Sequence, residues 1–526
     1  MKEYLTLIAQ FEHQFLTNPN FTLHTLQIHS RPISQVLFQV HSLTYEILRR
    51  NQMVLEEDED LDDLDDVENI LESLREGKNI ASAVAGSRTR ICKGGIILGI
   101  LAQRLSTLAG DVTARALLQN LLHESSKPYM HMLNLWLHHG EINDPHGEFL
   151  IKEQKSIRKE KLDEDYTDEY WEKRYTMREG EIPPQLESVK GKVLLAGKYL
   201  NVVRECGGID VSKDKSMDVP LTFDDPRFLE NINSAYSYAN TSLLDLLITT
   251  HALPARLRSL KHYFFLDRSD FFTHFLDLAS HELKKSSKLI SLTKLQSLLD
   301  LSLRQPGSIA ACDPFKEDVK VQMNDLALTD WLMRIVSVSG LSEDALSSGG
   351  AWIEESPVNP EKGDEEKKSI TGVNALQLDY TVPFPLSLVI SRKAVLRYQL
   401  LFRHLLSLKN IEQLLVVAWS DHMKTATWRN KSSNVRVEKW KARVWALRSR
   451  MLAFIQQLSY FCTNEVIEPN WLNLQNRLEH VKTVDELMQD HIDFLDTCLK
   501  ECMLTNSKLL RVPPQVIISN HRFIRN

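Results

Sequence analysis

Apolar side chains recur at helical spacing along most of the chain. Near the N-terminus, Ser30 precedes Pro32, a pair suited to the N-cap and first turn of a helix. The apolar residues that follow are spaced by four, three and four positions, which places them on one helical face: Val36, Val40, Leu43 and Ile47. Similar patterns predict further helices over residues 95–108, 113–124, 128–139, 186–202, 228–247 and 257–265.

The clearest helices lie in the C-terminal part. Ser391 is suited to cap a helix whose apolar stripe consists of Val395, Tyr398, Phe402, Leu405 and Leu408. Further on, apolar residues alternate between steps of three and four: Val444, Leu447, Met451, Phe454, Leu458 and Phe461. This seven-residue repeat is typical of a helix packed lengthwise in a bundle, so we expect the stripe to be buried there. No longer sequence repeat indicates a solenoid.

Four stretches interrupt the helical pattern. The acidic run at residues 56–68 predicts a solvated linker. Residues 140–151 contain turn formers and predict a tight turn or short hairpin between helices. Residues 305–314 look loosely ordered. Residues 340–371 are dominated by Ser, Gly, Pro, Glu and Lys, and predict a disordered surface insertion because they bury too little apolar surface.

Composition narrows the possible fold classes and the classes of protein. The 526 residues include 43% hydrophobic and 25% charged residues but only 19 Gly and 18 Pro, which favours an all-α fold. A net charge of −7 argues against a basic nucleic-acid binder. The six cysteines are scattered, which favours reduced thiols in the cytosol; Cys498 and Cys502 match neither a redox nor a zinc spacing. We expect no signal peptide and no membrane insertion.

One glycine-containing stretch superficially resembles a phosphate-binding loop. Gly191 and Gly197 are one residue too far apart, and Tyr199 stands where a Ser or Thr hydroxyl would bind magnesium. No strand precedes the stretch. We therefore interpret it as part of an amphipathic helix and predict no cofactor.

A polar cluster around residues 138–148 is the other candidate for chemistry. His138, His139, His146 and Glu148 match no established metal-ligand spacing. Asp144 and Glu148 could form the acid–base pair of a hydrolase, but Asp in a turn favours local backbone hydrogen bonds. We therefore predict no metal site, no catalytic residue and no enzyme.

A basic stretch with interleaved tryptophans leaves two interpretations open. Charge runs are usually solvated helix faces. Trp and Arg are also enriched at interface hot spots, so this stretch could contact an acidic partner. Its cations are Lys424, Arg429, Lys431, Arg436, Lys439, Lys441, Arg443, Arg448 and Arg450, and its tryptophans are Trp428, Trp440 and Trp445.

Ordered motifs recur along nearly the whole chain. In the first half they occupy residues 2–5, 10–15, 136–140, 143–149, 168–171 and 197–201. In the second half they occupy residues 263–266, 270–272, 385–391, 398–403, 419, 468–471 and 491–495. Together these motifs resemble the gamma-tubulin complex component family, and within it they look most similar to those of component 2. The chain starts inside the first motif, and residues 511–526 depart from the pattern. We therefore expect both the N-terminal and the C-terminal domain to be partial.

The resemblance implies two stacked helical bundles in an elongated scaffold. Residues 1–255 would form an N-terminal domain that makes lateral contacts between components, and residues 256–526 a C-terminal domain that binds gamma-tubulin. The implied function is to template microtubule nucleation at microtubule-organising centres and the spindle pole, in the cytoplasm and cytoskeleton. The implied partners are gamma-tubulin and other components, especially component 3, without nucleic acid. An alternative of another class is a helical adaptor or tethering subunit unrelated to tubulin.

Within that frame, basic residues of the C-terminal half are the predicted partner contacts. Tubulin surfaces are acidic as a family, so cations would assist encounter. Arg397, Arg403 and His404 flank the apolar stripe of their helix. The others come from the basic stretch: Lys424, Arg429, Lys439 and Arg443.

Overall fold

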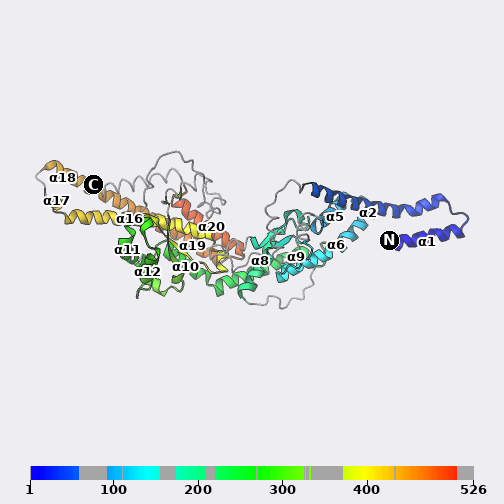
Figure 1. The fold of residues 1–526 in the computed structure, drawn as a ribbon, viewed down its shortest axis with the longest axis horizontal. Helices are drawn as coiled ribbons and strands as arrows, with labels where there is room; N and C mark the ends of the chain where they lie inside the picture. The colour runs from blue at the N-terminus through cyan, green and yellow to red at the C-terminus, as the bar shows by residue number, and fades with distance from the viewer. Residues whose placement is uncertain are drawn as a thin grey trace. The chain divides into compact units, whose positions relative to one another are not determined.

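The computed structural model describes residues 2–57, 92–108, 110–154, 173–207, 220–267, 270–324, 326, 328, 331–332, 371–431 and 434–505 (Figure 1). The chain divides into two compact units between Ser242 and Leu243. The functional division expected at residues 255 and 256 stays a prediction. Helices dominate both units, and the two sheets within the described residues have two strands each, so the predicted all-α class is confirmed.

Three sequence predictions concern residues outside this description. The acidic linker at residues 56–68 lies there except for Glu56 and Glu57, which end a helix. The insertion at residues 340–371 lies there except for Thr371, which forms an isolated bridge with Ser286. The atypical tail at residues 511–526 lies there entirely.

The N-terminal unit consists of six helices within the described residues and one small sheet. Its helices are α1 (Lys2–Thr17), α2 (Leu23–Glu57), α5 (Gly95–Thr107), α6 (Val112–His139), α8 (Lys190–Gly207) and α9 (Phe228–Asp245), the last of which crosses into the second unit. Strands β1 (Ile151–Glu153) and β2 (Tyr175–Met177) pair antiparallel, and the short η2 (Glu179–Glu181) follows.

The C-terminal unit is larger and is built around one long helix, α16 (Arg392–Lys424). Its antiparallel strands β3 (Val319–Met323) and β4 (Leu376–Tyr380) pair across a long sequence separation. Its other helical elements are η3 (Leu246–Thr250), α10 (Leu253–Phe264), α11 (Asp270–Leu283), η4 (Ser287–Leu289), α12 (Leu292–Leu303), η5 (Ile309–Cys312), η6 (Lys316–Asp318), α15 (Gly372–Ala375), η8 (Leu386–Leu388), α17 (Ala426–Arg429), α18 (Val435–Tyr460), η9 (Phe461–Ile467), α19 (Glu468–Leu478) and α20 (Val484–Glu501).

Two prolines lie inside helices, where sequence rules predicted helix starts. The predicted start at Ser30 is wrong, because α2 begins at Leu23 and continues through Pro32. Proline has no amide N–H, so the carbonyl of Ile28 lacks its helical donor. Both Pro32 and Ile28 are exposed, so this carbonyl is not left unpaired in a core. The two helices predicted over 113–124 and 128–139 are a single helix, because α6 continues through Pro128 with buried residues on both sides.

Trp136 of α6 is the centre of the N-terminal core. Its side chain is fully buried, and its Nε1 donates a 2.7 Å hydrogen bond to the carbonyl oxygen of Val193 in α8. Gly197, one turn further along α8, lies directly against the indole, since a Cβ built there would stand 2.0 Å from Trp136 Cε2. The ring of Tyr175 in β2 packs on Trp136 at 5.1 Å. The glycine that superficially suggested a phosphate loop therefore serves helix packing.

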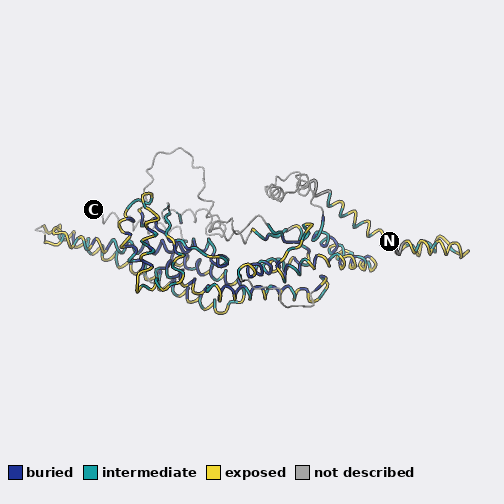
Figure 2. The backbone as a smooth tube through the Cα atoms, turned by 60° about the horizontal axis from the view of Figure 1, so that its bottom comes forward, coloured by how far each residue is buried: buried dark blue, intermediate teal, exposed yellow. Residues whose placement is uncertain are grey.

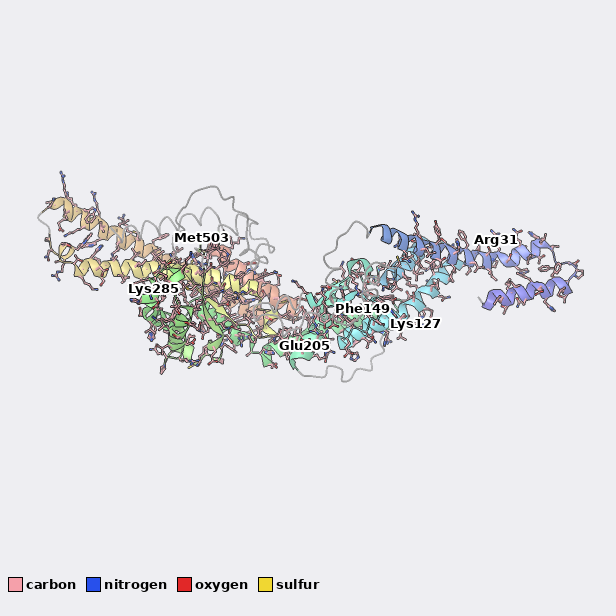
Figure 3. The ribbon with its side chains drawn as sticks, in the orientation of Figure 1. Arg31, Lys127, Phe149, Glu205, Lys285 and Met503 are labelled. Carbon is pink, nitrogen blue, oxygen red and sulfur yellow. The ribbon has the colours of Figure 1, made fainter. Side chains whose placement is uncertain are left out.

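The loop after α6 is held by its own carboxylate. Gly140 ends the helix with a left-handed backbone (φ 66°), and its carbonyl accepts a 2.9 Å hydrogen bond from Asn201 Nδ2. Both oxygens of Asp144 accept backbone hydrogen bonds at 2.9 Å, from Glu148 and from Phe149. Of the two alternatives predicted for residues 140–151, the structure has the turn and not the hairpin: only Ile151 is in a strand, and its partner is Met177. Phe149, labelled in Figure 3, is buried beneath this loop.

The core of the C-terminal unit is an aromatic cluster around α16. Ser391 caps this helix as predicted, its Oγ accepting from the amide nitrogen of Ala394 at 3.2 Å. The predicted apolar stripe is buried along its whole length. Tyr398 packs against Phe264 of α10 at 5.6 Å and against Phe265 at 5.3 Å, so α16 is fixed to α10 by ring contacts.

Residues 305–314, expected to be loosely ordered, include the short helix η5. Asp313 in this stretch accepts a 2.6 Å hydrogen bond from Ser259 Oγ of α10. The expectation is wrong because a distant element supplies the contacts that local sequence lacks. The same applies to β3 and β4, which local pattern did not predict and which stabilise each other across the unit.

His491 of α20 is buried as a neutral imidazole. Its Nδ1 lies 3.3 Å from the carbonyl oxygen of Val389, so Nδ1 donates, and Nε2 accepts from the Tyr398 hydroxyl at 3.0 Å. Burial is the main reason that its pKa falls from 6.5 to about 4. Protonation would place a charge in this core and abolish the acceptor at Nε2.

We therefore expect acid to destabilise the C-terminal unit through His491. Below pH 6.5 the unfolded state binds a proton that the folded state refuses until about pH 4, so stability falls as pH falls through that window. The expected loss is about 2 kcal/mol between pH 7.5 and pH 5, measured by urea unfolding. His491→Gln should flatten the pH dependence over this range; an unchanged dependence in the variant would contradict the assignment.

Candidate partner-binding surfaces

Helices α16 and α18 run side by side and are joined through α17, forming what we call the α16–α18 arm (residues 411–461) (Figure 1). Lys441 of α18 is buried and donates to the carbonyl oxygens of Thr427 and Asn430 at 2.8 and 3.0 Å. Arg448 donates to the carbonyl oxygen of Leu415 at 3.3 Å. Two cations of the basic stretch thus hold the arm together and are not available to a partner.

Aromatic rings close the end of the arm. His422 stacks on Trp428 with ring centroids 4.1 Å apart, and Trp428 packs on Trp440 at 5.2 Å. Burial, and next the nearby Arg448 guanidinium, lower the pKa of His422, which favours the neutral ring in the stack. Trp440 is 54% exposed, so the cluster presents an aromatic surface to solvent.

Four predicted contact residues lie on the surface of this arm. Lys424 ends α16, Arg429 ends α17, and Lys439 and Arg443 belong to α18; all four are exposed. None forms an ion pair with another residue in the described part of the chain. Their charge is therefore available to a partner, although whether one binds them stays a prediction.

The other three predicted contact residues are buried, which corrects the expected position. Arg397 is 3% exposed and forms a two-point ion pair with Asp496 of α20, at 2.6 and 3.4 Å. Arg403 is equally buried and donates to the carbonyl oxygens of Leu326 and Asn374. Burial lowers the pKa of Arg403 to about 10.

His404 is the third of these residues, with a ring Nε2 that lies 3.9 Å from Cys462 Sγ. The reason for the correction is common to all three. The first half of α16 is surrounded by other elements, so positions flanking its apolar stripe are also inside the unit. These side chains stabilise the fold, and whether any of them contacts a partner stays a prediction.

Half of the predicted seven-residue stripe of α18 lies at the surface, and Val444, Met451 and Leu458 are only half-buried. Leu447, Phe454 and Phe461 are 49%, 55% and 37% exposed. The face toward α16 is instead formed by Lys441 and Ile455, the two buried residues of α18. The expectation of burial is wrong for the exposed half of the stripe because, among the described helices, α16 is the main neighbour of α18 and packs on another face.

A second exposed apolar surface lies in the N-terminal unit, along α1 and α2. In Figure 2 the part of the chain next to the N-terminus is coloured largely as exposed, and Arg31 marks α2 in Figure 3. Two successive helices with this much solvent-facing apolar area are typical of a protein–protein contact. The side chains involved are Leu5, Ile8, Phe15, Leu16, Leu23, Ile28, Leu37, Phe38, Val40, Tyr45 and Leu48.

The candidate chemical groups are engaged in structure. His138 Nε2 lies 3.1 Å from Asn231 Oδ1. The described residues contain no group of three or more His, Cys, Asp or Glu that could hold a metal ion. Cys498 and Cys502 are both buried free thiols. Among the helices described, none has the length and apolar character needed to cross a bilayer.

Two family models match successive parts of the chain. The model described as gamma tubulin complex component N-terminal matches residues 1–249, and the one described as gamma tubulin complex component C-terminal matches residues 253–523. The chain belongs to the gamma-tubulin complex component family. The resemblance drawn from the sequence motifs is thereby confirmed, and the family is one of structural components.

Individual relatives place the chain within the family. It is 48% identical to spindle pole body component alp4 of Schizosaccharomyces pombe, over 98% of this chain and 70% of that protein. It is 40% identical to gamma-tubulin complex component 2 of Mus musculus, over 80% of this chain and 44% of that protein. Identity to component 3 of Homo sapiens is 25%, over 76% of this chain and 40% of that protein. The chain is thus more similar to this component 2 protein than to this component 3 protein, as the motifs predicted.

Proposed function

We propose that this gamma-tubulin complex component is a scaffold that holds gamma-tubulin and templates microtubule nucleation at the spindle pole and other microtubule-organising centres. The observation that carries the proposal is the match of both family models to adjoining halves of one chain. The enzyme interpretation has no such support, and the named relatives are components of complexes.

The physical role of such a scaffold is to fix distances. Starting a polymer is slow because the first subunits lose translational freedom before enough contacts form to offset the loss. A rigid subunit that holds one gamma-tubulin beside the next raises the effective concentration for the following lateral contact. Close-packed cores such as those around Trp136 and Tyr398 supply the rigidity.

Each unit carries a surface suited to one kind of partner, either a neighbouring component or gamma-tubulin. The exposed apolar face of α1 and α2 would contact a neighbouring component, component 3 in particular. The basic and aromatic α16–α18 arm would contact gamma-tubulin, whose family has an acidic surface, and charge would speed the encounter.

Charge reversal on the arm tests the second contact. With Lys424, Arg429, Lys439 and Arg443 each changed to Glu, we expect gamma-tubulin binding to weaken at least tenfold at physiological salt, because four exposed cations become anions. Binding is measured by co-purification and by titration with labelled gamma-tubulin. Co-purification of component 3 should be unaffected, since that contact is assigned to the other unit.

The matched control reverses four exposed cations on other elements of the same unit: Lys284, Lys288, Arg304 and Lys500, each to Glu. Equal weakening in the control would show a general effect of net charge and remove the arm from the contact. If the unaltered chain captures neither gamma-tubulin nor component 3, the scaffold function itself is wrong, and the helical adaptor becomes the better interpretation.

A further inference from the structure

Helix α18 and the first residue of η9 carry a coiled-coil repeat of which one row is largely exposed. Two rows of apolar residues each recur every seven positions, offset from one another by three, which is the a and d pattern of a two-helix seam. We call these eight residues the open seam: Val437, Trp440, Val444, Leu447, Met451, Phe454, Leu458 and Phe461.

One row of the open seam faces solvent in the described part of the chain, whereas Val444, Met451 and Leu458 of the other row are half-buried. Trp440, Leu447 and Phe454, successive members of one row, are each about half exposed at 54%, 49% and 55%. The contact with α16 uses a third row on the adjoining side, formed by Lys441, Arg448 and the buried Ile455. Figure 1 shows α18 alongside α16 for most of its length. The pairing with α16 therefore leaves Leu447 and Phe454 about half exposed.

A row of arginines borders the open seam on its other side. Arg436, Arg443 and Arg450 each directly precede a seam residue and are spaced by seven positions. All three are exposed, and none forms an ion pair with a described residue. In a coiled coil such flanking positions pair with charges of the other helix and decide which partner is accepted.

We propose that the open seam of α18 binds an amphipathic helix of a partner protein, with a seven-residue apolar repeat bordered by Glu or Asp. The apolar rows specify a helix, because only a helix matches their spacing along the whole seam. The arginine row favours a partner helix with acidic residues on each side of its apolar repeat. A second copy of α18 is disfavoured, since its own arginines would meet this row. The inference is drawn from α18 alone and does not depend on the proposed function.

The geometry also sets the length of the partner helix. At about 1.5 Å per residue, the seam from Val437 to Phe461 runs for about 36 Å. A helix of about 25 residues would cover it. A shorter helix would leave part of the exposed row formed by Trp440, Leu447 and Phe454 in water.

A designed peptide provides the test. The probe is a labelled 28-residue helix, about eight turns long, with Leu at its a and d positions and Glu at its e and g positions. We expect saturable binding to the full chain by fluorescence anisotropy, and at least tenfold weaker binding of the same peptide with Lys in place of Glu. Changing Arg436, Arg443 and Arg450 to Glu should reverse this preference.

Two further variants separate the seam from general stickiness and from misfolding. Changing Leu447 and Phe454 to Asp should abolish peptide binding, whereas Ser449→Asp, on an exposed position outside the seam, should leave it unchanged. Changing Lys424, Arg429 and Lys439 to Glu should weaken gamma-tubulin binding more than peptide binding, so the two proposals fail separately. Absence of peptide binding, or equal affinity for the acidic and Lys peptides, would overturn the inference.

Discussion

Replacing Trp136 with alanine is expected to destabilise the N-terminal unit by about 3 to 5 kcal/mol, the range for removing a large buried aromatic side chain. The indole is fully buried and its Nε1 donates to Val193. The variant loses this hydrogen bond and leaves a cavity between α6, α8 and β2. Thermal or urea unfolding measures the effect, and loss of soluble expression is the expected extreme.

Gly197 provides the matched test of this packing. A methyl group at Gly197 would meet the Trp136 ring at 2.0 Å, so Gly197→Ala alone should also destabilise the unit. In the Trp136→Ala background the added methyl group enters the cavity, and its effect should shrink or change sign. Simple additivity of the two substitutions would show that the residues are not in contact.

Replacing Arg397 with alanine is expected to destabilise the C-terminal unit by about 2 to 4 kcal/mol, because it removes a buried charged hydrogen-bonding group that joins α16 to α20. Arg443→Ala, on an exposed position of α18, should change stability by less than about 0.5 kcal/mol. The comparison separates a residue that stabilises the fold from one available to a partner.

A double-mutant cycle with Asp496 tests the pairing directly. Asp496→Ala leaves the buried Arg397 without its counter-charge, and Arg397→Ala removes the need for it. The double variant should therefore be more stable than the sum of the single effects predicts, by at least about 1 kcal/mol. Additive effects would contradict the pairing, and weakened gamma-tubulin binding without any loss of stability would restore Arg397 to the contact surface.

Much of the fold follows from local sequence. Ser391 caps α16 because its hydroxyl satisfies an orphan amide, and the stripe from Val395 to Leu408 identifies the buried face. The family motifs around Trp136 and Gly197 were also recognisable in the sequence. The structure supplies their reason, which is the direct contact of an indole with a helix backbone.

Local rules failed where a distant element supplies or removes a contact. Pro128 lies inside α6 because buried residues on both sides keep the helix continuous. Strand β3 pairs with β4, a partner far away in the chain, so neither segment indicates the pairing by itself. Arg397 is buried because α16 is surrounded, whereas periodicity alone only divides a helix into an apolar and a polar face.

The sequence by itself determined the helical class, the family and the repeat along α18, since all three depend on residue type and spacing along one chain. Only the tertiary structure decided which apolar stripes are covered. A seven-residue repeat shows that a helix is suited to pack lengthwise against another helix. It does not show on which side that other helix lies in the folded chain. In this chain α16 covers the row of Ile455 and leaves the row of Phe454 in solvent.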